Sequence, residues 1–146
     1  MTNAVGDTIL GLLEQLTLEE KVALVSGTSM WRTAGNDRIG LSPMVFSDGP
    51  IGVRGEDYQR GVGVTVPCGS ALAATWDPDL IRSVGAVLGQ EARFKEVHVV
   101  LAPVVNMHRS LLAGRNFENY SEDPYLASRA AVAFIRGVQS LSLIHI

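Results

Sequence analysis

Short apolar runs alternate with amphipathic helical patterns along most of the chain, and this alternation limits the possible folds more than any other feature. Runs at residues 43–48 (PMVFSD) and 97–103 (VHVVLAP) have the length and composition of buried strands, and residues 70–76 (SALAATW) form a third candidate. Helical patterns follow at residues 77–92 and 123–138, each opened by Asp-Pro. Because parallel strands are joined through helices, this order predicts an α/β fold.

The first 40 residues have a different pattern, with two helices and a loop predicted ahead of the first strand. Apolar residues recur at helical spacing in residues 7–16, where Asp7 is the predicted N-cap. Thr17 and Glu20 have the spacing of a capping box and predict the start of a second helix. Residues 27–40 lose this periodicity, so we expect a loop there.

Composition excludes several classes of function. The chain has 146 residues, 47% of them hydrophobic, and a net charge of -3, which is ordinary for one globular domain. Its 12 Lys and Arg residues are scattered, so nucleic acid is not an expected partner. No apolar run approaches the roughly 20 residues of a membrane helix, and the first residues lack the basic segment of a secretory signal. We therefore expect a cytoplasmic protein without a membrane partner.

The sequence also argues against a metal or an organic cofactor. His98 and His108 have no cysteine or carboxylate partners at metal-ligand spacing, so no metal site is expected. Residues 61–66 (GVGVTV) lack the third glycine of a dinucleotide fingerprint and open no helix, so no cofactor is expected either. Because His98 lies within the apolar run 97–103, we interpret it as a core or supporting histidine.

Polar groups gather where the predicted strands end. Asp48 ends the first apolar run, Arg54 follows within a few residues, and Arg115 lies in the polar stretch after the run 97–103. In parallel α/β folds these loops share one edge, which carries the active site. A carboxylate with two guanidinium groups suits a ligand rich in hydroxyls. An ion pair that only braces the edge is the alternative, and the residue chemistry leaves both open.

Residues 113–127 (AGRNFENYSEDPYLA) carry two glutamates that invite a catalytic reading. Glu118 and Glu122 could be the paired carboxylates of a glycosidase. However, they lie in one loop beside helix-capping groups, where carboxylates usually bind backbone N–H groups or a neighbouring arginine. We therefore favour a supporting role for both glutamates over a catalytic one.

Five stretches carry motifs in a specific order and spacing: LTLEEKVALVSG, FSDGPIGVR, PCGSALAATWDPDL, LAPVVNMHRSLLAGRNFENYSEDPYLA and FIRGVQ. Together they resemble the opening blocks of glycoside hydrolase family 3, the β-glucosidase-type enzymes. The resemblance implies the beginning of a (β/α)8 TIM-like barrel, roughly three of its eight β/α units. It also implies a retaining, exo-acting hydrolase that removes terminal β-linked sugars, with a small β-glucoside or oligosaccharide as substrate.

The resemblance also implies roles for individual residues. Asp48 resembles the aspartate that binds the hydroxyls of the non-reducing sugar in this family, and Arg54 and Arg115 resemble its substrate-binding arginines. The resemblance makes the stretch around Arg115 an active-site loop. Three further side chains are then expected to support the site from behind: Asn116, Glu118 and His98.

The resemblance places the catalytic groups of the family after the last residue of this chain. The aspartate nucleophile and the general acid both come later, so the chain alone is expected to be inactive and to lack the C-terminal part of its own protein. A β-xylosidase or arabinosidase of the same family is one alternative. A non-catalytic sugar-binding fragment is the other.

The chain is predicted to consist of a barrel part, residues 1–140, and a non-native tail, residues 141–146 (LSLIHI). The family pattern predicts a polar connection after Gln139, whereas this tail is mostly apolar. The end of a transposon-type sequencing adaptor, CTGTCTCTTATACACATC, encodes the same amino acids in frame. A genuine short strand is the alternative interpretation.

Overall fold

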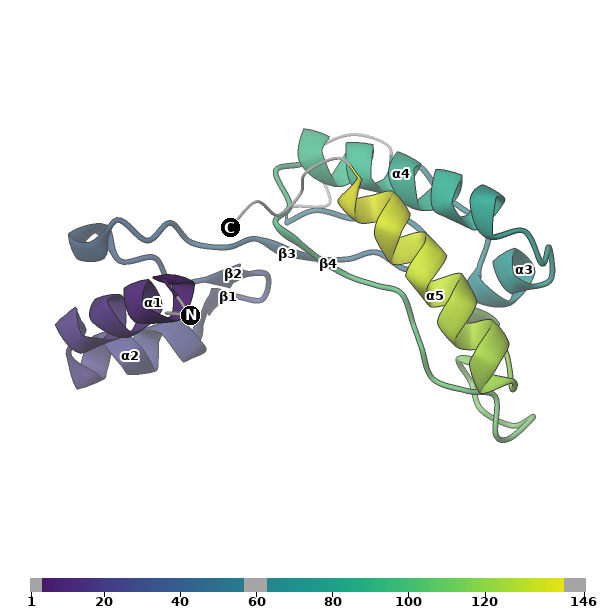
Figure 1. Ribbon diagram of the computed structural model, residues 1–146, viewed down its shortest axis with the longest axis horizontal. Helices are drawn as coiled ribbons and strands as arrows, with labels where there is room; N and C mark the ends of the chain where they lie inside the picture. The colour runs from purple at the N-terminus through teal and green to yellow at the C-terminus, as the bar shows by residue number, and fades with distance from the viewer. Residues whose placement is uncertain (1–3, 57–62, 141–146) are drawn as a thin grey trace. The chain divides into compact units, whose positions relative to one another are not determined.

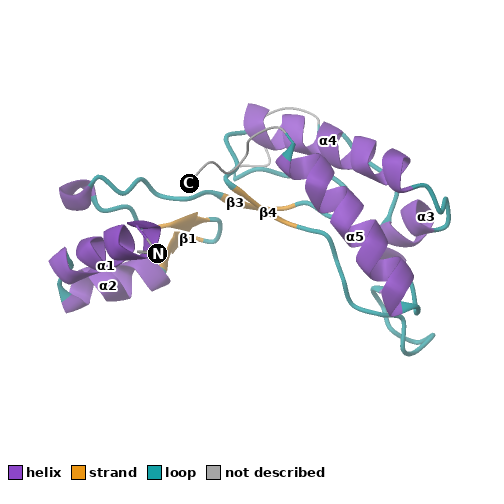
Figure 2. Ribbon diagram, viewed as in Figure 1, coloured by secondary structure: helices purple, strands orange, loops and turns teal. Residues whose placement is uncertain are grey.

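The computed structural model of the chain describes residues 4–56 and 63–140. The chain divides into two units, residues 1–45 and residues 46–146. Figure 1 labels the helices and strands of both units, and Figure 2 colours them by type. The predicted tail at residues 141–146 lies outside the described residues, so its non-native origin stays a prediction.

The first unit begins with two helices, as the sequence predicts. Its elements are α1 (Ala4–Gln15), α2 (Leu18–Val25), β1 (Gly27–Ser29), β2 (Arg32–Thr33) and the 3-10 turn η1 (Asp37–Ile39). The capping box is confirmed: the Thr17 hydroxyl accepts from the Glu20 N–H at 3.2 Å, and the Glu20 carboxylate accepts from the Thr17 N–H at 2.8 Å. Both bonds satisfy N–H groups that the first turn of α2 leaves without helical partners.

Two local predictions for the first unit are wrong. Asp7 does not cap α1, because the helix already begins at Ala4; the carboxylate lies in the first turn, where it still complements the helix dipole. Residues 27–40 are not one loop, since β1 and β2 pair antiparallel, with Gly27 opposite Thr33. The Ser29 side chain accepts from the Trp31 N–H at 3.2 Å and so stabilises the turn between these strands.

The second unit contains a parallel strand pair at two of the predicted positions. Strand β3 (Phe46–Asp48) pairs with β4 (Val99–Leu101), and Asp48 lies opposite Leu101. The chain passes between them through α3 (Gly69–Ala73) and α4 (Pro78–Phe94), and α5 (Pro124–Gln139) follows β4. The predicted caps of both long helices are confirmed, because Asp77 and Asp123 each accept from two backbone N–H groups of the first turn.

The prediction of a strand at residues 70–76 is wrong, because this stretch forms the helix α3. Alanine and leucine have the highest helix propensities, and no β-branched residue occurs before Thr75. The start of the helix also lies very close to another segment: a Cβ on Gly69 would be 2.1 Å from the carbonyl oxygen of Glu118. The α/β class is confirmed, whereas the three-unit partial barrel stays a prediction, since a parallel pair also occurs in open sheets.

The core of the second unit lies between α4 and α5. A Cβ on Gly85 would be 2.4 Å from the Phe134 carbonyl oxygen, and one on Gly137 would be 2.1 Å from the Arg82 carbonyl oxygen. These glycines let the two helix backbones approach, and Leu88 and Phe134 are almost fully buried. Figure 1 shows α4 and α5 running alongside each other. This packed pair is the rigid support for the loops that leave β3 and β4.

Candidate functional site

Asp48 and the segment that carries Arg115 belong to the same edge of the parallel strand pair. Asp48 is the last residue of β3, and it pairs with Leu101, the last residue of β4. The loops after both strands therefore start side by side, and residues 102–123 form the loop that contains Arg115. Asp48 is partly exposed and Arg115 is exposed, so both side chains are accessible to a ligand in the described part of the chain.

Ser47 fixes the loop that follows β3. Its side chain is fully buried, and its hydroxyl accepts from the backbone N–H groups of Arg54 and Gly55 at 3.1 and 2.9 Å. The hydroxyl also donates to the Asp48 carbonyl oxygen at 2.7 Å, and the Arg54 N–H reaches that oxygen at 3.3 Å. The loop therefore folds back onto β3, and the Arg54 backbone lies beside that of Asp48.

The guanidinium group of Arg115 is paired with Glu118. The Nε and Nη2 atoms of Arg115 lie 2.7 and 2.6 Å from the Glu118 Oε2. This hydrogen bond raises the pKa of Arg115 above its ordinary value, and the negative charge of Asp48 acts in the same direction. Arg115 and Glu118 thus form an ion pair, and the charge of Asp48 adds a smaller contribution. The pairing also supports the interpretation of Glu118 as a supporting residue.

Hydrogen bonds from side chains to backbone carbonyl oxygens hold the rest of the Arg115 loop. The Asn116 side chain donates to the Ser110 carbonyl oxygen at 2.7 Å. The His108 Nε2 lies 2.7 Å from the Asn116 carbonyl oxygen, and the Ser70 hydroxyl donates to the Phe117 carbonyl oxygen at 3.1 Å. Because a carbonyl oxygen only accepts, the His108 Nε2 is the donor in this contact.

His98 does not occupy a core position. It is exposed and directly precedes Val99, the first residue of β4. Asp48 pairs with Leu101, the last residue of that strand, so His98 and Asp48 lie at different ends of the strand pair. The buried residue at the start of the run is Val97. Of the two roles predicted for His98, the core position is therefore wrong, and the supporting role stays a prediction.

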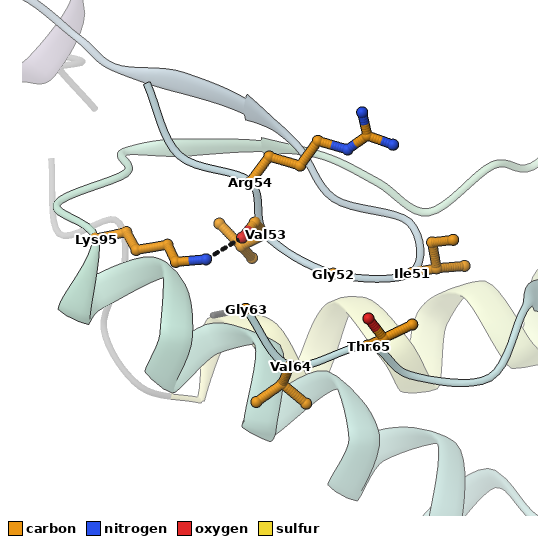
Figure 3. Close-up of a pocket in the computed structure, with 8 residues that line it drawn as sticks. All are labelled: Ile51, Gly52, Val53, Arg54, Gly63, Val64, Thr65 and Lys95. Carbon is orange, nitrogen blue, oxygen red and sulfur yellow. Dashed lines mark hydrogen bonds between the residues drawn. The ribbon is translucent and has the colours of Figure 1, made fainter. Parts of the chain in front are cut away.

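The two arginines line different hollows. Arg54 lines a cavity of about 300 Å³ together with residues 51–53, residues 63–65 and Lys95 (Figure 3). Arg115 lines another of about 260 Å³, in which Asn106 and Arg109 supply further polar groups. Asp48 lines neither of these hollows. The charge of Asp48 therefore acts on Arg115, whereas the contact of Asp48 with Arg54 is a hydrogen bond between their backbones.

Sequence reasoning missed several residues that shape the site. Ser47 sits in an apolar run, and a single hydroxyl at a buried strand position is the signal that could have identified it. Lys95 is almost fully buried, and its spacing of four residues from Glu91 is a weak signal for a pair. His108 and Ser70 gave no signal, because their partners are distant carbonyl oxygens.

The described residues contain neither a metal-binding cluster nor a helix that could span a membrane. No group of three or more His, Cys, Asp or Glu side chains among them is arranged to hold a metal ion. None of the described helices combines the length and apolar character of a membrane span.

Comparisons with known proteins extend over nearly the whole chain. The β-glucosidase of Rhizobium radiobacter is 50% identical over 132 residues, which are 88% of this chain and 16% of that protein. Among solved structures, the β-glucosidase of Kluyveromyces marxianus in complex with glucose matches with a TM-score of 0.85 and 39% identity, over 90% of this chain and 16% of that one. β-Glucosidase 3B of Thermotoga neapolitana in complex with α-D-glucose matches with a TM-score of 0.83 and 38% identity, over 92% and 22%.

The chain spans about 16% of the length of the curated relatives that it matches. The family model that describes the glycosyl hydrolase family 3 N-terminal domain matches residues 1–145. With the motifs at the ends of β3 and β4 and the parallel pairing of these strands, this match leads to one conclusion. The chain belongs to glycosyl hydrolase family 3, and its residues 1–145 match the N-terminal domain of that family.

Proposed function

We propose that the complete protein is a retaining, exo-acting β-glucosidase and that this chain contributes part of its sugar-binding site. The observation that carries the proposal is the cluster of Asp48, Arg115 and Glu118 at the ends of the paired strands β3 and β4, where Glu118 holds the exposed side chain of Arg115. The similarity to β-glucosidases, two of them solved with glucose, supports glucose as the sugar.

The cluster has the chemistry that binding a terminal sugar requires. An ionised Asp48 accepts hydrogen bonds from two neighbouring hydroxyls of the sugar. Glu118 holds the Nε and Nη2 side of the Arg115 fork, and the Nη1 side then donates to the sugar in a fixed direction. Arg54 supplies the second fork from the loop after β3, whose backbone Ser47 fixes.

The reaction itself needs two carboxyl groups that we place in the downstream part of the protein. An aspartate attacks the anomeric carbon and displaces the leaving group, whose oxygen is protonated by a second carboxylic acid. Water then hydrolyses the glycosyl-enzyme with retention of the β configuration. Asp48, Arg54 and Arg115 orient the sugar through both steps, and the 146-residue chain alone lacks activity.

The test compares the full-length product of the source gene with the 146-residue chain. We expect the full-length product to hydrolyse an aryl β-glucoside faster than the matching aryl β-xyloside and to release β-glucose first, as NMR would show. We expect no turnover by the chain alone. A preference for the xyloside would favour the pentosidase alternative, and an inactive full-length product that binds glucose would favour the non-catalytic one.

A further inference from the structure

A buried ion pair lies at the C-terminal end of α4, below the loop that carries Arg54. The Lys95 Nζ is 2.9 Å from the Glu91 Oε1, and the side chains of Lys95 and Glu91 are 3% and 8% exposed. No step of the proposed reaction uses either residue. Buried charges are costly unless they are paired and hydrogen-bonded, so this pair calls for a specific reason.

The pair connects two loop segments to the helix. The Lys95 Nζ donates to the Val53 carbonyl oxygen, and the Glu91 Oε1 accepts from the Val64 N–H at 2.8 Å. Figure 3 shows Lys95 extending from the end of α4 to Val53, while Arg54 extends away from Lys95. The packing is close, since a Cβ on Gly63 would be 2.9 Å from both the Glu91 Oε1 and the Lys95 Nζ.

The contact with Val53 acts on the peptide bond that precedes Arg54. The carbonyl of Val53 and the N–H of Arg54 belong to one planar peptide group, and in a trans peptide they point in opposite directions. Lys95 binds the carbonyl end of this plane, and the Ser47 hydroxyl binds the N–H end at 3.1 Å. Hydrogen bonds at both ends restrain the rotation of this plane, and they therefore restrain the direction in which the Arg54 side chain leaves the backbone.

We propose that Glu91 and Lys95 are positioning residues for Arg54, an inference that rests on the proposed function. Lys95 clamps the peptide plane, and Glu91 keeps the Lys95 ammonium group directed at Val53. An apolar pair of similar size would fill the same space but would supply no donor for the Val53 carbonyl oxygen. The clamp therefore acts on sugar affinity through the orientation of one guanidinium group.

The test uses the full-length product of the source gene and glucose as the probe. Lys95→Met alone leaves the Glu91 carboxylate buried without a cation, which impairs folding and makes the single variant a poor test of affinity. The main variant is therefore the double substitution Glu91→Gln with Lys95→Met, which removes both charges and retains an acceptor for the Val64 N–H. It is prepared with Arg54 intact and with Arg54→Ala. The control is Arg38→Met, which removes the exposed ion pair with Glu20 in the first unit.

Glucose affinity is measured by NMR titration, and the exchange of the Arg54 and Gly55 amides is measured by hydrogen exchange. With Arg54 intact, we expect the double variant to bind glucose about tenfold more weakly and to exchange both amides faster. With Arg54→Ala in place, the same double substitution should change the affinity less than about twofold, because contacts made through one residue are not additive. Arg38→Met should leave both readouts unchanged.

An equal loss of affinity in both backgrounds, or no loss with Arg54 intact, would overturn the positioning role. Unchanged amide exchange would also overturn it, because the clamp itself would then be absent. If Arg54→Ala leaves the affinity of the otherwise unaltered protein unchanged, the proposed function is wrong at Arg54 and the positioning role fails with it. That outcome can be told apart from a failure of the positioning role alone, because it is measured on Arg54→Ala without the double substitution.

Discussion

The loops after β3 and β4 each depend on a glutamate paired with a cation a few residues away in sequence, yet the two pairs differ in environment. Glu91 and Lys95 are both buried, with side-chain exposures of 8% and 3%. In the second pair Glu118 is 14% exposed, whereas Arg115 is 74% exposed. Both pairs use the same kind of charge attraction, but only one of them leaves its cation open to a ligand.

This difference shows how burial assigns a role to an ion pair. A buried ammonium group has no access to a substrate, so Lys95 can only hold the structure around it, here the Val53 carbonyl oxygen. An exposed guanidinium group held at one side by a largely buried carboxylate remains available on its other side. Lys95 thus holds the backbone of the loop after β3, whereas in the loop after β4 the guanidinium group of Arg115 is open to a ligand.

The largest effect should come from breaking the buried pair. We expect Lys95→Met to lower the free energy of unfolding by about 3–5 kcal/mol, because the Glu91 carboxylate would remain buried without its partner. Adding Glu91→Gln should recover most of this loss, since no unpaired charge is left. Urea unfolding of the full-length product measures both variants. A Lys95→Met protein as stable as the wild type would contradict the comparison between the two pairs.

Asp48→Ala should produce the next largest effect, on catalysis and not on folding. Each charge-assisted hydrogen bond to a sugar hydroxyl contributes about 1.5–3 kcal/mol, so we expect kcat/KM of the full-length product to fall by at least about a hundredfold, roughly 3 kcal/mol. Asp79→Ala, in the exposed first turn of α4, is the matched control and should retain activity. Near-normal kcat/KM for Asp48→Ala, or a loss explained by unfolding, would make Asp48 a structural residue.

Glu118→Gln should have a smaller effect, because the Arg115 side chain is exposed to solvent and the amide oxygen of the variant still accepts from it. We expect KM for an aryl β-glucoside to rise by less than about fivefold, with kcat nearly unchanged. Steady-state kinetics of the full-length product decides this. A loss as large as that of Asp48→Ala would show that Glu118 takes part in the chemistry, against the supporting role that its contact with Arg115 indicates.

The smallest effect should come from the exposed pair of Glu20 and Arg38 in the first unit. The hydrogen bond from Arg38 and that from the Thr17 N–H lower the pKa of Glu20 from 4.5 to about 2. A lowered pKa stabilises the folded state above the unfolded value, so this contribution is complete above pH 4.5 and is lost as the pH falls through about 2. NMR titration of the Glu20 carboxyl carbon measures the shift; a midpoint near 4.5 would contradict it. Glu20→Gln should remove the pH dependence.

Apart from the start of α1, the helix starts are the features that local sequence predicts well. Thr17 and Glu20, like Asp77 and Asp123, act on backbone N–H groups two or three residues away, so the relevant partners are already adjacent in sequence. Strands β3 and β4 were also predicted, since an uninterrupted apolar run is typical of a parallel strand. The candidate residues Asp48, Arg54 and Arg115 follow from the same order, because loops after parallel strands share an edge.

The errors and omissions concern contacts between distant residues. The stretch at residues 70–76 is apolar enough for a strand, but its helix places Gly69 against the Glu118 carbonyl oxygen, a neighbour that no local pattern contains. Lys95 binds the carbonyl oxygen of a residue 42 positions earlier. Hydrophobic period and capping describe interactions within about one helical turn, whereas these contacts exist only once the chain has packed. The motifs that identify the family can thus be recognised in the sequence alone. The contact of Lys95 with the Val53 carbonyl oxygen, in contrast, forms only when packing buries the two residues together.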